Sequence, residues 1–479
     1  MNLRALSIAF FAFHLSFAAM STTGNEVTVA VDGALRHLDV TVCPKSEFTE
    51  LRSGFRDASQ YLTKIADQDG QPLSLDGAKI PVPAGTRCVS YRFDLGASRG
   101  ANRRYAYLAD SNVAVSASLW LWRPYPGSRT QTFVEFETAS QISVPWIEIE
   151  AAGDKARRFE IPLSPESDES VTVFGKFAQC DIPVPGGLLK ASILRGQTRG
   201  QTTELSHWVQ QTASHVAMTY GRFPNPLPQV IVVPVAKNAL DYGEPVPFGH
   251  VIRNGGEAVQ FFVNQNRGLE AFMADWTATH EFSHLLIPYI DSREKWISEG
   301  LASYYQNVLM ARSGMYTQQK AWRKIYEGFL RGIDSAPRLP LEDAMRIGGW
   351  DGLMKTYWGG TAVFLMADAE LRRRSNNQVS LDSVLGKLQK CCLPAKRVWS
   401  GERLFTKLDT LSPEPVFKDL YDRYRRSVDF PDFTPIFADL GLNPGARSIR
   451  FSQAPLANVR EAIMAPHAGF EPQPINCEG

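Results

Sequence analysis

Two histidines and a glutamate in the segment Thr279-His280-Glu281-Phe282-Ser283-His284 have the types and spacing of a metal site. The surrounding pattern predicts a helix, and residues four apart share one face of a helix, so both imidazoles can reach one ion. Glu281 does not share that direction and points towards a metal-bound water, which it can deprotonate. The competing interpretation is that both histidines are ordinary core residues, so the pattern requires a third ligand to decide.

Glu299 is the candidate for that third ligand. A second helical stretch, Trp296 to Tyr305, begins twelve residues after His284. Zinc accepts imidazole and carboxylate donors at about 2.0 to 2.2 Å, and three protein ligands leave the fourth position for water. A surface glutamate is the alternative, but the apolar neighbours Ile297 and Leu301 and the small Gly300 favour a side chain that faces a pocket. We therefore expect one zinc ion per chain, held by His280, His284 and Glu299.

These segments resemble the gluzincin metallopeptidases, which carry the third ligand on the helix after the HExxH helix. The similarity to the glycyl aminopeptidase family runs, with gaps, from about Thr202 to Leu442. It includes Tyr357 to Asp368, which looks like the tyrosine-bearing helix of that family. The resemblance implies that the Tyr357 hydroxyl donates to the oxyanion of the tetrahedral intermediate. Packing of Tyr357 against the core is the alternative, and Tyr304 or Tyr305 could take the same role.

Two departures from the family concern substrate binding and domain content. Where the family has a Gly-Gly-Leu-Glu-His-like stretch in its cleft, this chain has the segment 249–257, whose Glu257 is a candidate contact for a substrate amino terminus. Family members often carry a PDZ domain after the helical region. Only 37 residues follow Leu442, so we expect no PDZ domain there.

The leading functional prediction is a zinc-dependent metallopeptidase that hydrolyses peptide bonds as an aminopeptidase, with Glu281 as the general base. A zinc endopeptidase would share this chemistry and differ in how the end of the cleft is closed. A non-catalytic zinc-bearing protein, whose β domain binds a cell-envelope ligand, is the alternative from another class. The intact Glu281 favours an enzyme.

The chain changes character along its length, which predicts a multidomain α+β protein. Short β-rich segments between turn residues predict an N-terminal antiparallel β-sandwich over 25–185, followed by a linker at Pro183 to Gly187. The resemblance implies a thermolysin-like α/β catalytic domain over 190–335, in which one helix is expected from Leu269 to Ile287. A C-terminal helical domain over 336–445 and a tail over 446–479 complete the prediction. The aromatic cluster of Trp120, Trp122 and Tyr125 is interpreted as strand core ending in a turn.

The first nineteen residues predict export. Arg4 precedes an apolar stretch from Ala5 to Phe17 and small residues at Ala18 and Ala19, as in a cleavable signal peptide, so the mature chain is expected to be periplasmic or secreted, with no transmembrane segment. The six cysteines are then plausible disulfide partners, with Cys43 near Cys88 and the Cys391-Cys392 pair able to reach Cys477. The 51 basic and 50 acidic residues nearly cancel, so nothing indicates a nucleic-acid partner. The expected partner is a peptide or protein substrate, and the oligomeric state stays open.

Overall fold

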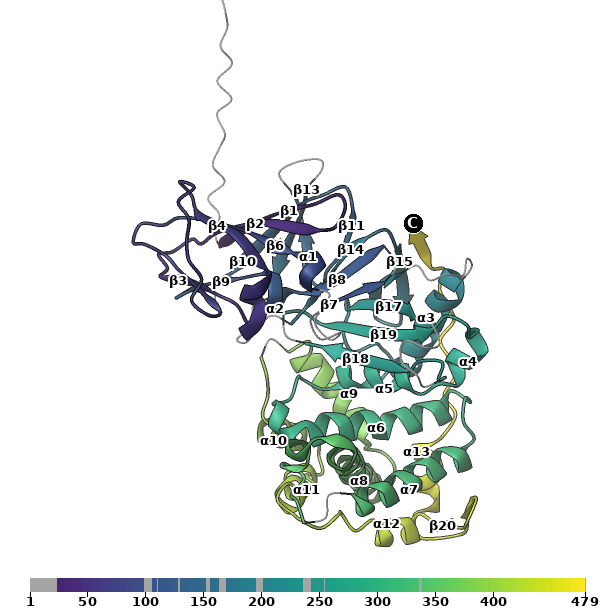
Figure 1. Ribbon diagram of the computed structural model, residues 1–479. Coiled ribbons are helices and arrows are strands. Elements are labelled where there is room, and N and C mark those ends of the chain that lie inside the picture. Colours follow the sequence, from purple (N-terminus) through teal and green to yellow (C-terminus); the bar gives the residue numbers. More distant parts are fainter. Residues whose placement is uncertain are drawn as a thin grey trace, which may run out of the picture.

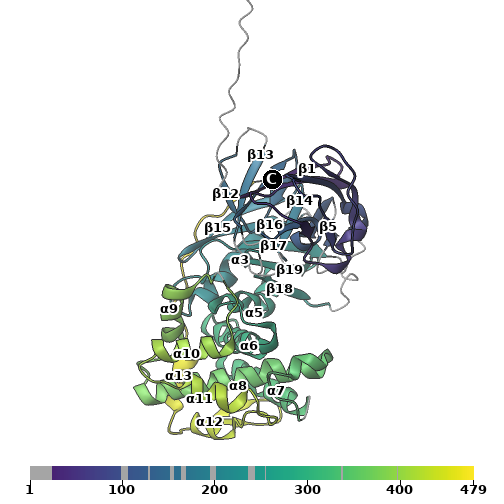
Figure 2. The same cartoon turned by 90° about the vertical axis from the view of Figure 1, so that its left-hand side faces the viewer.

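The computed structural model describes residues 24–98, 106–109, 111–127, 130–151, 156–162, 169–194, 201–235, 243–253, 255–335, 338–395 and 397–478. The predicted signal peptide lies outside these residues. The N-terminal strands form one end of the molecule, a second sheet lies in the middle, and helices form the other end (Figures 1 and 2). No helix among the described residues combines the length and apolar character that crossing a membrane requires.

Two sheets share one core in the N-terminal region. The larger has the order β12-β13-β10-β1-β2-β6-β4 and the smaller β11-β14-β8-β7. Their strands are β1 Asn25–Val31, β2 His37–Cys43, β4 Leu62–Asp67, β6 Val89–Asp94, β7 Ala106–Ala109, β8 Asn112–Ser116, β10 Thr132–Glu137, β11 Gln141–Ser143, β12 Ile147–Ile149, β13 Ala156–Ile161 and β14 Val171–Gly175. This confirms the predicted β-sandwich, except that β1 and β10 pair in parallel. Trp120 and Trp122 are fully buried, so they are core residues.

The central sheet has the order β18-β19-β17-β16-β15-β22. Its strands are β15 Ala178–Val184, β16 Gly187–Ile193, β17 Gln229–Val235, β18 Phe248–Ile252, β19 Ala258–Asn264 and β22 Asn476–Glu478. β15 and β16 form an antiparallel hairpin from Ala178 paired with Ile193 to Val184 paired with Gly187. The predicted linker at Pro183 to Gly187 is therefore a hairpin turn, in which Pro185 precedes Gly186 at φ +73°. Proline and glycine occur in tight turns as well as in linkers, so composition alone did not distinguish them.

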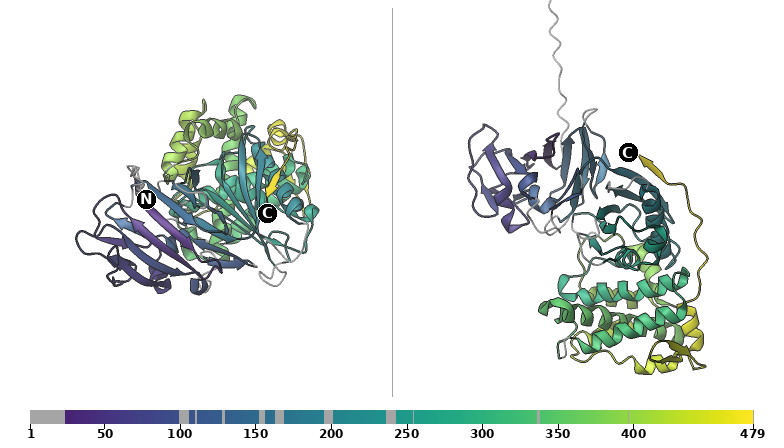
Figure 3. Two further views of the ribbon diagram at one scale, coloured as in Figure 1. Left: turned by 90° about the horizontal axis from the view of Figure 1, so that it is seen from above. Right: turned by 45° about the vertical axis from the view of Figure 1, so that its right-hand side comes forward.

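The C-terminal segment, which was predicted as a tail over 446–479, returns to the central sheet. Figure 3 shows it running along the outer side of the molecule, from the helices to the edge of the central sheet. There β22 pairs with β15, and Cys477 forms a disulfide with Cys180. Cys391 and Cys392 are bonded to each other, so the bond to Cys477 that the sequence left open for this pair is not formed. The suggested pair of Cys43 and Cys88 is present.

Helices cover one face of the central sheet and build the far end of the molecule. They are α3 Gln201–Ala217, α4 Leu269–Ala274, α5 Thr277–Ser283, α6 Lys295–Arg312, α7 Gln318–Asp334, α8 Gly349–Ser375, α9 Leu381–Cys392, α10 Gly401–Leu411, α11 Phe417–Tyr424, α12 Thr434–Asp439 and α13 Ala457–Ile463. The helix predicted from Leu269 to Ile287 is interrupted at Asp275. The Asp275 backbone is extended, and its carboxylate accepts a hydrogen bond at 2.7 Å from the amide of Thr277, the first residue of α5.

Candidate metal centre

α5, the short 3-10 helix η2 (His284–Leu286) that continues it, and α6 bring the three predicted ligands together. One donor atom each from His280, His284 and Glu299 lies within 4.8 Å of the other two. The Nε2 atoms of His280 and His284 are 3.3 Å and 3.4 Å from Oε2 of Glu299. Both imidazoles are buried, with 3% and 8% of their residue surfaces exposed. The expected convergence of two imidazoles and one distant carboxylate is present.

These distances fit zinc. Two ligands of a tetrahedral ion with bonds near 2.05 Å are separated by about 3.3 Å, which is close to both nitrogen–oxygen distances in this cluster. Burial by itself raises the pKa of the Glu299 carboxyl, but the adjacent imidazoles of His284 and His280 outweigh it and hold that pKa well below its usual value. Glu299 is therefore an ionised carboxylate, the form in which it can act as a ligand.

Two further side chains orient the imidazoles, and the sequence analysis missed both. Nδ1 of His280 lies 2.9 Å from Oε1 of Gln306, and Nδ1 of His284 lies 2.8 Å from Oγ of Ser298. The Gln306 contact requires Nδ1 of His280 to donate, which leaves Nε2 free to bind a metal. Gln306 is seven residues after Glu299 on α6, so its position on the same helical face was a usable signal.

Glycines set the distance between α6 and the tyrosine-bearing α8. A Cβ atom on Gly300 would overlap the backbone of Gly360, and one on Gly360 would overlap the carbonyl oxygen of Trp296. The Thr361 hydroxyl donates across the contact to the Gly300 carbonyl at 3.2 Å. Gly300 and Gly360 therefore allow α6 and α8 to approach closely. This contact fixes Tyr357 on α8 relative to Glu299 on α6.

Tyr357 packs against His280, one of the predicted metal ligands. Its ring stacks on the His280 imidazole, with centroids 5.6 Å apart and planes within 4° of parallel. Burial and the nearby charges of Glu299 and Glu281 raise the pKa of Tyr357 well above its usual value. The phenol therefore stays protonated and can donate a hydrogen bond at neutral pH.

The rival tyrosines are engaged elsewhere. The Tyr304 hydroxyl donates to Asp368 at 2.7 Å, and the Tyr305 hydroxyl donates to Asp382 at 2.8 Å. Both tyrosines are almost completely buried. They belong to a polar network that links α6, α8 and α9, so Tyr357 is the tyrosine available to the cluster.

Glu281 faces a cleft beside the cluster. The cavity has a volume of about 890 Å³, and Glu281, Tyr357 and Gly249 of β18 are among the residues that line it. A Cβ atom on Gly249 would come 2.5 Å from Cγ of Glu281, so the strand passes directly against this carboxylate. Burial raises the pKa of Glu281, although His280 and His284 pull it down. A carboxylate in this position can exchange a proton with a molecule in the cleft.

Glu257 does not reach the cleft, contrary to the suggested contact with a substrate amino terminus. Its Oε1 accepts a hydrogen bond from Arg253 at 2.6 Å, and its Oε2 is in close contact with the Asn225 amide. Arg253 in turn donates to the carbonyls of His284 and Ile287, at 2.9 Å and 2.8 Å. Glu257 therefore helps to fix the end of the HExxH segment.

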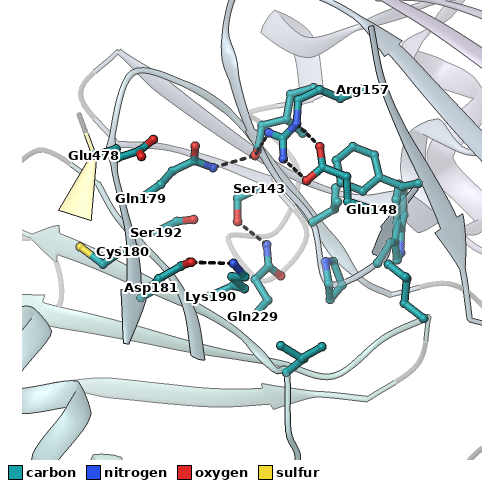
Figure 4. Close-up of a pocket in the computed structure, with 18 of the residues that line it drawn as sticks. Ser143, Glu148, Arg157, Gln179, Cys180, Asp181, Lys190, Ser192, Gln229 and Glu478 are labelled. Carbon is teal, nitrogen blue, oxygen red and sulfur yellow. Dashed lines mark hydrogen bonds and ion pairs between the residues drawn. The ribbon is translucent and has the colours of Figure 1, made fainter. Parts of the chain in front are cut away.

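Another cavity, of about 450 Å³, lies between the N-terminal strands and the central sheet, away from the cluster. Its charged groups face one another in pairs (Figure 4): Arg157 binds Glu148 at 2.7 Å, and Lys190 binds Asp181 at 2.8 Å. Paired charges of this kind are typical of a structural contact. The HExxH cluster is therefore the better candidate for chemistry.

Comparisons with known proteins agree with this choice. Residues 289–337 match the family described as M61 glycyl aminopeptidase. The fold is similar to an aminopeptidase N family protein from Idiomarina loihiensis, with a TM-score of 0.63, 12% identity and coverage of 87% of this chain and 78% of that one. An M1 zinc metallopeptidase from Deinococcus radiodurans matches with a TM-score of 0.52, 16% identity and coverage of 85% and 93%.

The yeast LTA4 hydrolase has the same fold, with a TM-score of 0.51, 13% identity and coverage of 83% of this chain and 66% of that one. Among curated proteins, the comparison found no match. At these identities the structural likeness concerns the fold, whereas the family match covers the whole of α6 and α7. Together they support a zinc metallopeptidase, and the chain resembles the glycyl aminopeptidase family of gluzincins.

Proposed function

We propose that this protein is a zinc-dependent peptidase, with His280, His284 and Glu299 as the metal ligands and Glu281 as the general base. The convergence of the three donor atoms on a site of zinc dimensions is the observation that carries the proposal. A bound zinc ion would lower the pKa of a coordinated water and polarise the scissile carbonyl. Side chains of the cleft would carry out the proton transfers and stabilise the oxyanion.

Glu281 is placed to move the proton. It is partly buried beside both imidazoles and faces the cleft, so it can take a proton from the attacking water and pass it to the leaving amine. The Tyr357 hydroxyl is protonated and held by the stack on His280, so it can donate to the oxyanion that forms on the substrate. Ser298 and Gln306 keep the imidazoles in orientation during this step.

The edge of the central sheet suits an extended peptide. β18 is the end strand of that sheet among the described strands, so its outer backbone groups can pair with a substrate chain. Phe248, Trp276 and Trp350 line the same cleft and are 42%, 39% and 65% exposed. Large exposed aromatic side chains around one cavity are typical of a binding surface. A peptide on β18 would pass directly by Glu281.

Within this chemistry we propose aminopeptidase action, because the chain resembles an aminopeptidase family. Glu244 and Asp275 line the cleft and are the carboxylates that could receive a substrate amine. Endopeptidase action is the second candidate, and the engagement of Glu257 with Arg253 favours it. An N-acetylated peptide separates the two, since a blocked amine stops an aminopeptidase and spares an endopeptidase.

The decisive experiment combines turnover with metal content. Purified protein should hydrolyse a peptide library, lose activity with a chelator and regain it with zinc. Glu281→Gln should retain stoichiometric zinc and lose turnover by about 10²- to 10⁴-fold. Glu270→Gln, an exposed change of the same kind on α4, should behave as wild type. Zinc binding without hydrolysis of any peptide would instead support the non-catalytic alternative.

We also propose that the protein is exported. Three disulfides pair all six cysteines of the sequence, and they support folding in an oxidising compartment. N-terminal sequencing of protein recovered from the periplasm or medium should find a mature chain that begins near Met20. Recovery of the uncleaved chain from the cytoplasm would contradict export.

A further inference from the structure

Two lysines of α7 line one side of the proposed catalytic cleft, and this side is called the basic wall. Lys320 and Lys324 on α7 line the same cavity as Glu281 and Tyr357. They are four residues apart, so they lie on one face of the helix. Nζ of Lys320 lies 4.0 Å from the centre of the Tyr316 ring, and Nζ of Lys324 lies 5.5 Å from it. Tyr316 is buried, so its ring is a fixed support for both ammonium groups.

Among the residues that the structure describes, neither lysine forms an ion pair with a carboxylate. In the described part of the chain, no carboxylate oxygen lies within 4 Å of either ammonium group, whereas the neighbouring Arg323 is paired with Glu327. Burial lowers the pKa of Lys324, and the charge of Lys320 lowers it further. The charges of Glu327 and Asp275 offset part of this effect without an ion pair to Lys324 among the described residues. The two ammonium groups therefore still repel one another, and an anion that contacts both would relieve the repulsion.

The helix direction adds to the positive potential. Lys320 lies in the first turn of α7, where the Thr317 side chain accepts the Lys320 amide, and that turn contains no acidic residue. The amino end of a helix carries a partial positive charge, which a lysine reinforces. The wall therefore combines two ammonium groups with a helix end.

The acidic residues of the cleft leave this potential in place. The Asp275 carboxylate attracts Lys324 at longer range, but it accepts the amides of Thr277 at 2.7 Å and Val246 at 3.4 Å. Glu244 is exposed and has no ion pair with either lysine among the described residues. Both lysines thus remain available to a molecule in the cleft.

We propose that Lys320 and Lys324 bind a carboxylate of the substrate. Peptides with an acidic side chain next to the scissile bond, or with a free C-terminal carboxylate close to it, are then the preferred substrates. This inference rests on the proposed peptidase function and specifies its substrate class. The two lysines act in specificity and take no part in proton transfer.

The test measures kcat/KM for two peptide series. One series places Glu, Gln or Lys at each position flanking the scissile bond, and the other compares short peptides with a free or an amidated C-terminus. The wild type should prefer Glu to Gln, or the free to the amidated end, by about tenfold or more. The Lys320→Gln/Lys324→Gln variant should lose that preference and cleave the neutral peptide within about twofold of wild type.

Charge reversal and a matched control complete the design. Lys320→Glu/Lys324→Glu should transfer the preference to Lys-containing peptides, because the wall then attracts cations. Lys390→Gln removes one exposed charge at the end of α9, and it should leave the preference unchanged. No preference in the wild type, or a preference that survives the double variant, overturns the inference while hydrolysis still supports the peptidase.

The inference also remains testable if no peptide is cleaved. Calorimetry with the zinc-loaded wild type and an uncleaved acidic peptide should then show binding that is lost in the double Gln variant and absent for the neutral analogue. Equal binding of both peptides would refute the role of the lysines. That outcome is separate from the failure of turnover, which concerns Glu281 and the metal site.

Discussion

Replacement of Tyr357 by Phe isolates one hydrogen-bond donor. The Phe ring can keep the stack on His280, and His280, His284 and Glu299 remain as ligands, so the zinc content should not change. The change removes only the hydroxyl of a partly buried side chain, which lies close to the charge of Glu299. The substitution should therefore weaken only the stabilisation of the oxyanion in the transition state.

The magnitude follows from the number and environment of the donors lost. One preorganised donor in a buried site contributes about 2.7 to 4 kcal/mol to the transition state, so kcat should fall by about 10²- to 10³-fold. KM should change little, because an uncharged substrate carbonyl needs this donor less than the oxyanion does. Steady-state kinetics with a fluorogenic peptide, together with metal analysis, measures both quantities.

Tyr305→Phe is the matched control, since it also removes a buried hydroxyl. That hydroxyl donates to Asp382 at 2.8 Å, within the network between α6 and α9. The control should lose about 1 to 3 kcal/mol of unfolding free energy and keep its kcat. If Tyr357→Phe retains kcat within about threefold of wild type at full zinc occupancy, the assigned donor role is wrong.

Three further predictions concern packing, pH and metal affinity. Gly360→Ala places a methyl group against the Trp296 carbonyl and should lower the unfolding free energy by about 1 to 3 kcal/mol. Gly33→Ala, whose added methyl group meets nothing within 4 Å, should change the unfolding free energy little, and equal effects of the two changes in urea titrations would contradict the close contact. Burial lowers the pKa of His215 from 6.5 to about 4, so the native state binds fewer protons than the unfolded state in this range. The stabilisation by neutral His215 should be fully present above about pH 6.5, and the unfolding free energy should fall by up to about 3 kcal/mol as the pH falls towards 4. His215→Gln should remove this pH dependence of the unfolding free energy, and an unchanged dependence would show that His215 is not its source. Gln306→Ala should weaken zinc affinity by about 10- to 100-fold in a competition assay with a chelator, and unchanged affinity would show that the contact to His280 is dispensable.

The functional cluster was predictable because each member belongs to a local pattern. The spacing of His280 and His284 specifies one face of a helix whatever surrounds it, and Glu299 follows on the next helix with a glycine beside it. The β-sandwich was predictable for the same reason, since alternation along a strand is a property of neighbouring residues. The break at Asp275 was missed because the apolar pattern continues across it, while the hydrogen bond between Asp275 and the Thr277 amide depends on the local backbone.

The sequence by itself determined the identity of the donor atoms, the spacing that lets two imidazoles share a helix face, and the chemistry that such donors permit. Only the tertiary structure decided which partners meet across long separations. It paired Cys180 with Cys477, packed Gly300 against Gly360, paired Glu257 with Arg253, and placed Lys320 and Lys324 in the same cleft as Glu281 and Tyr357. The physical reason is that helix and strand periodicity act between near neighbours in the chain, whereas these contacts depend on how whole elements pack.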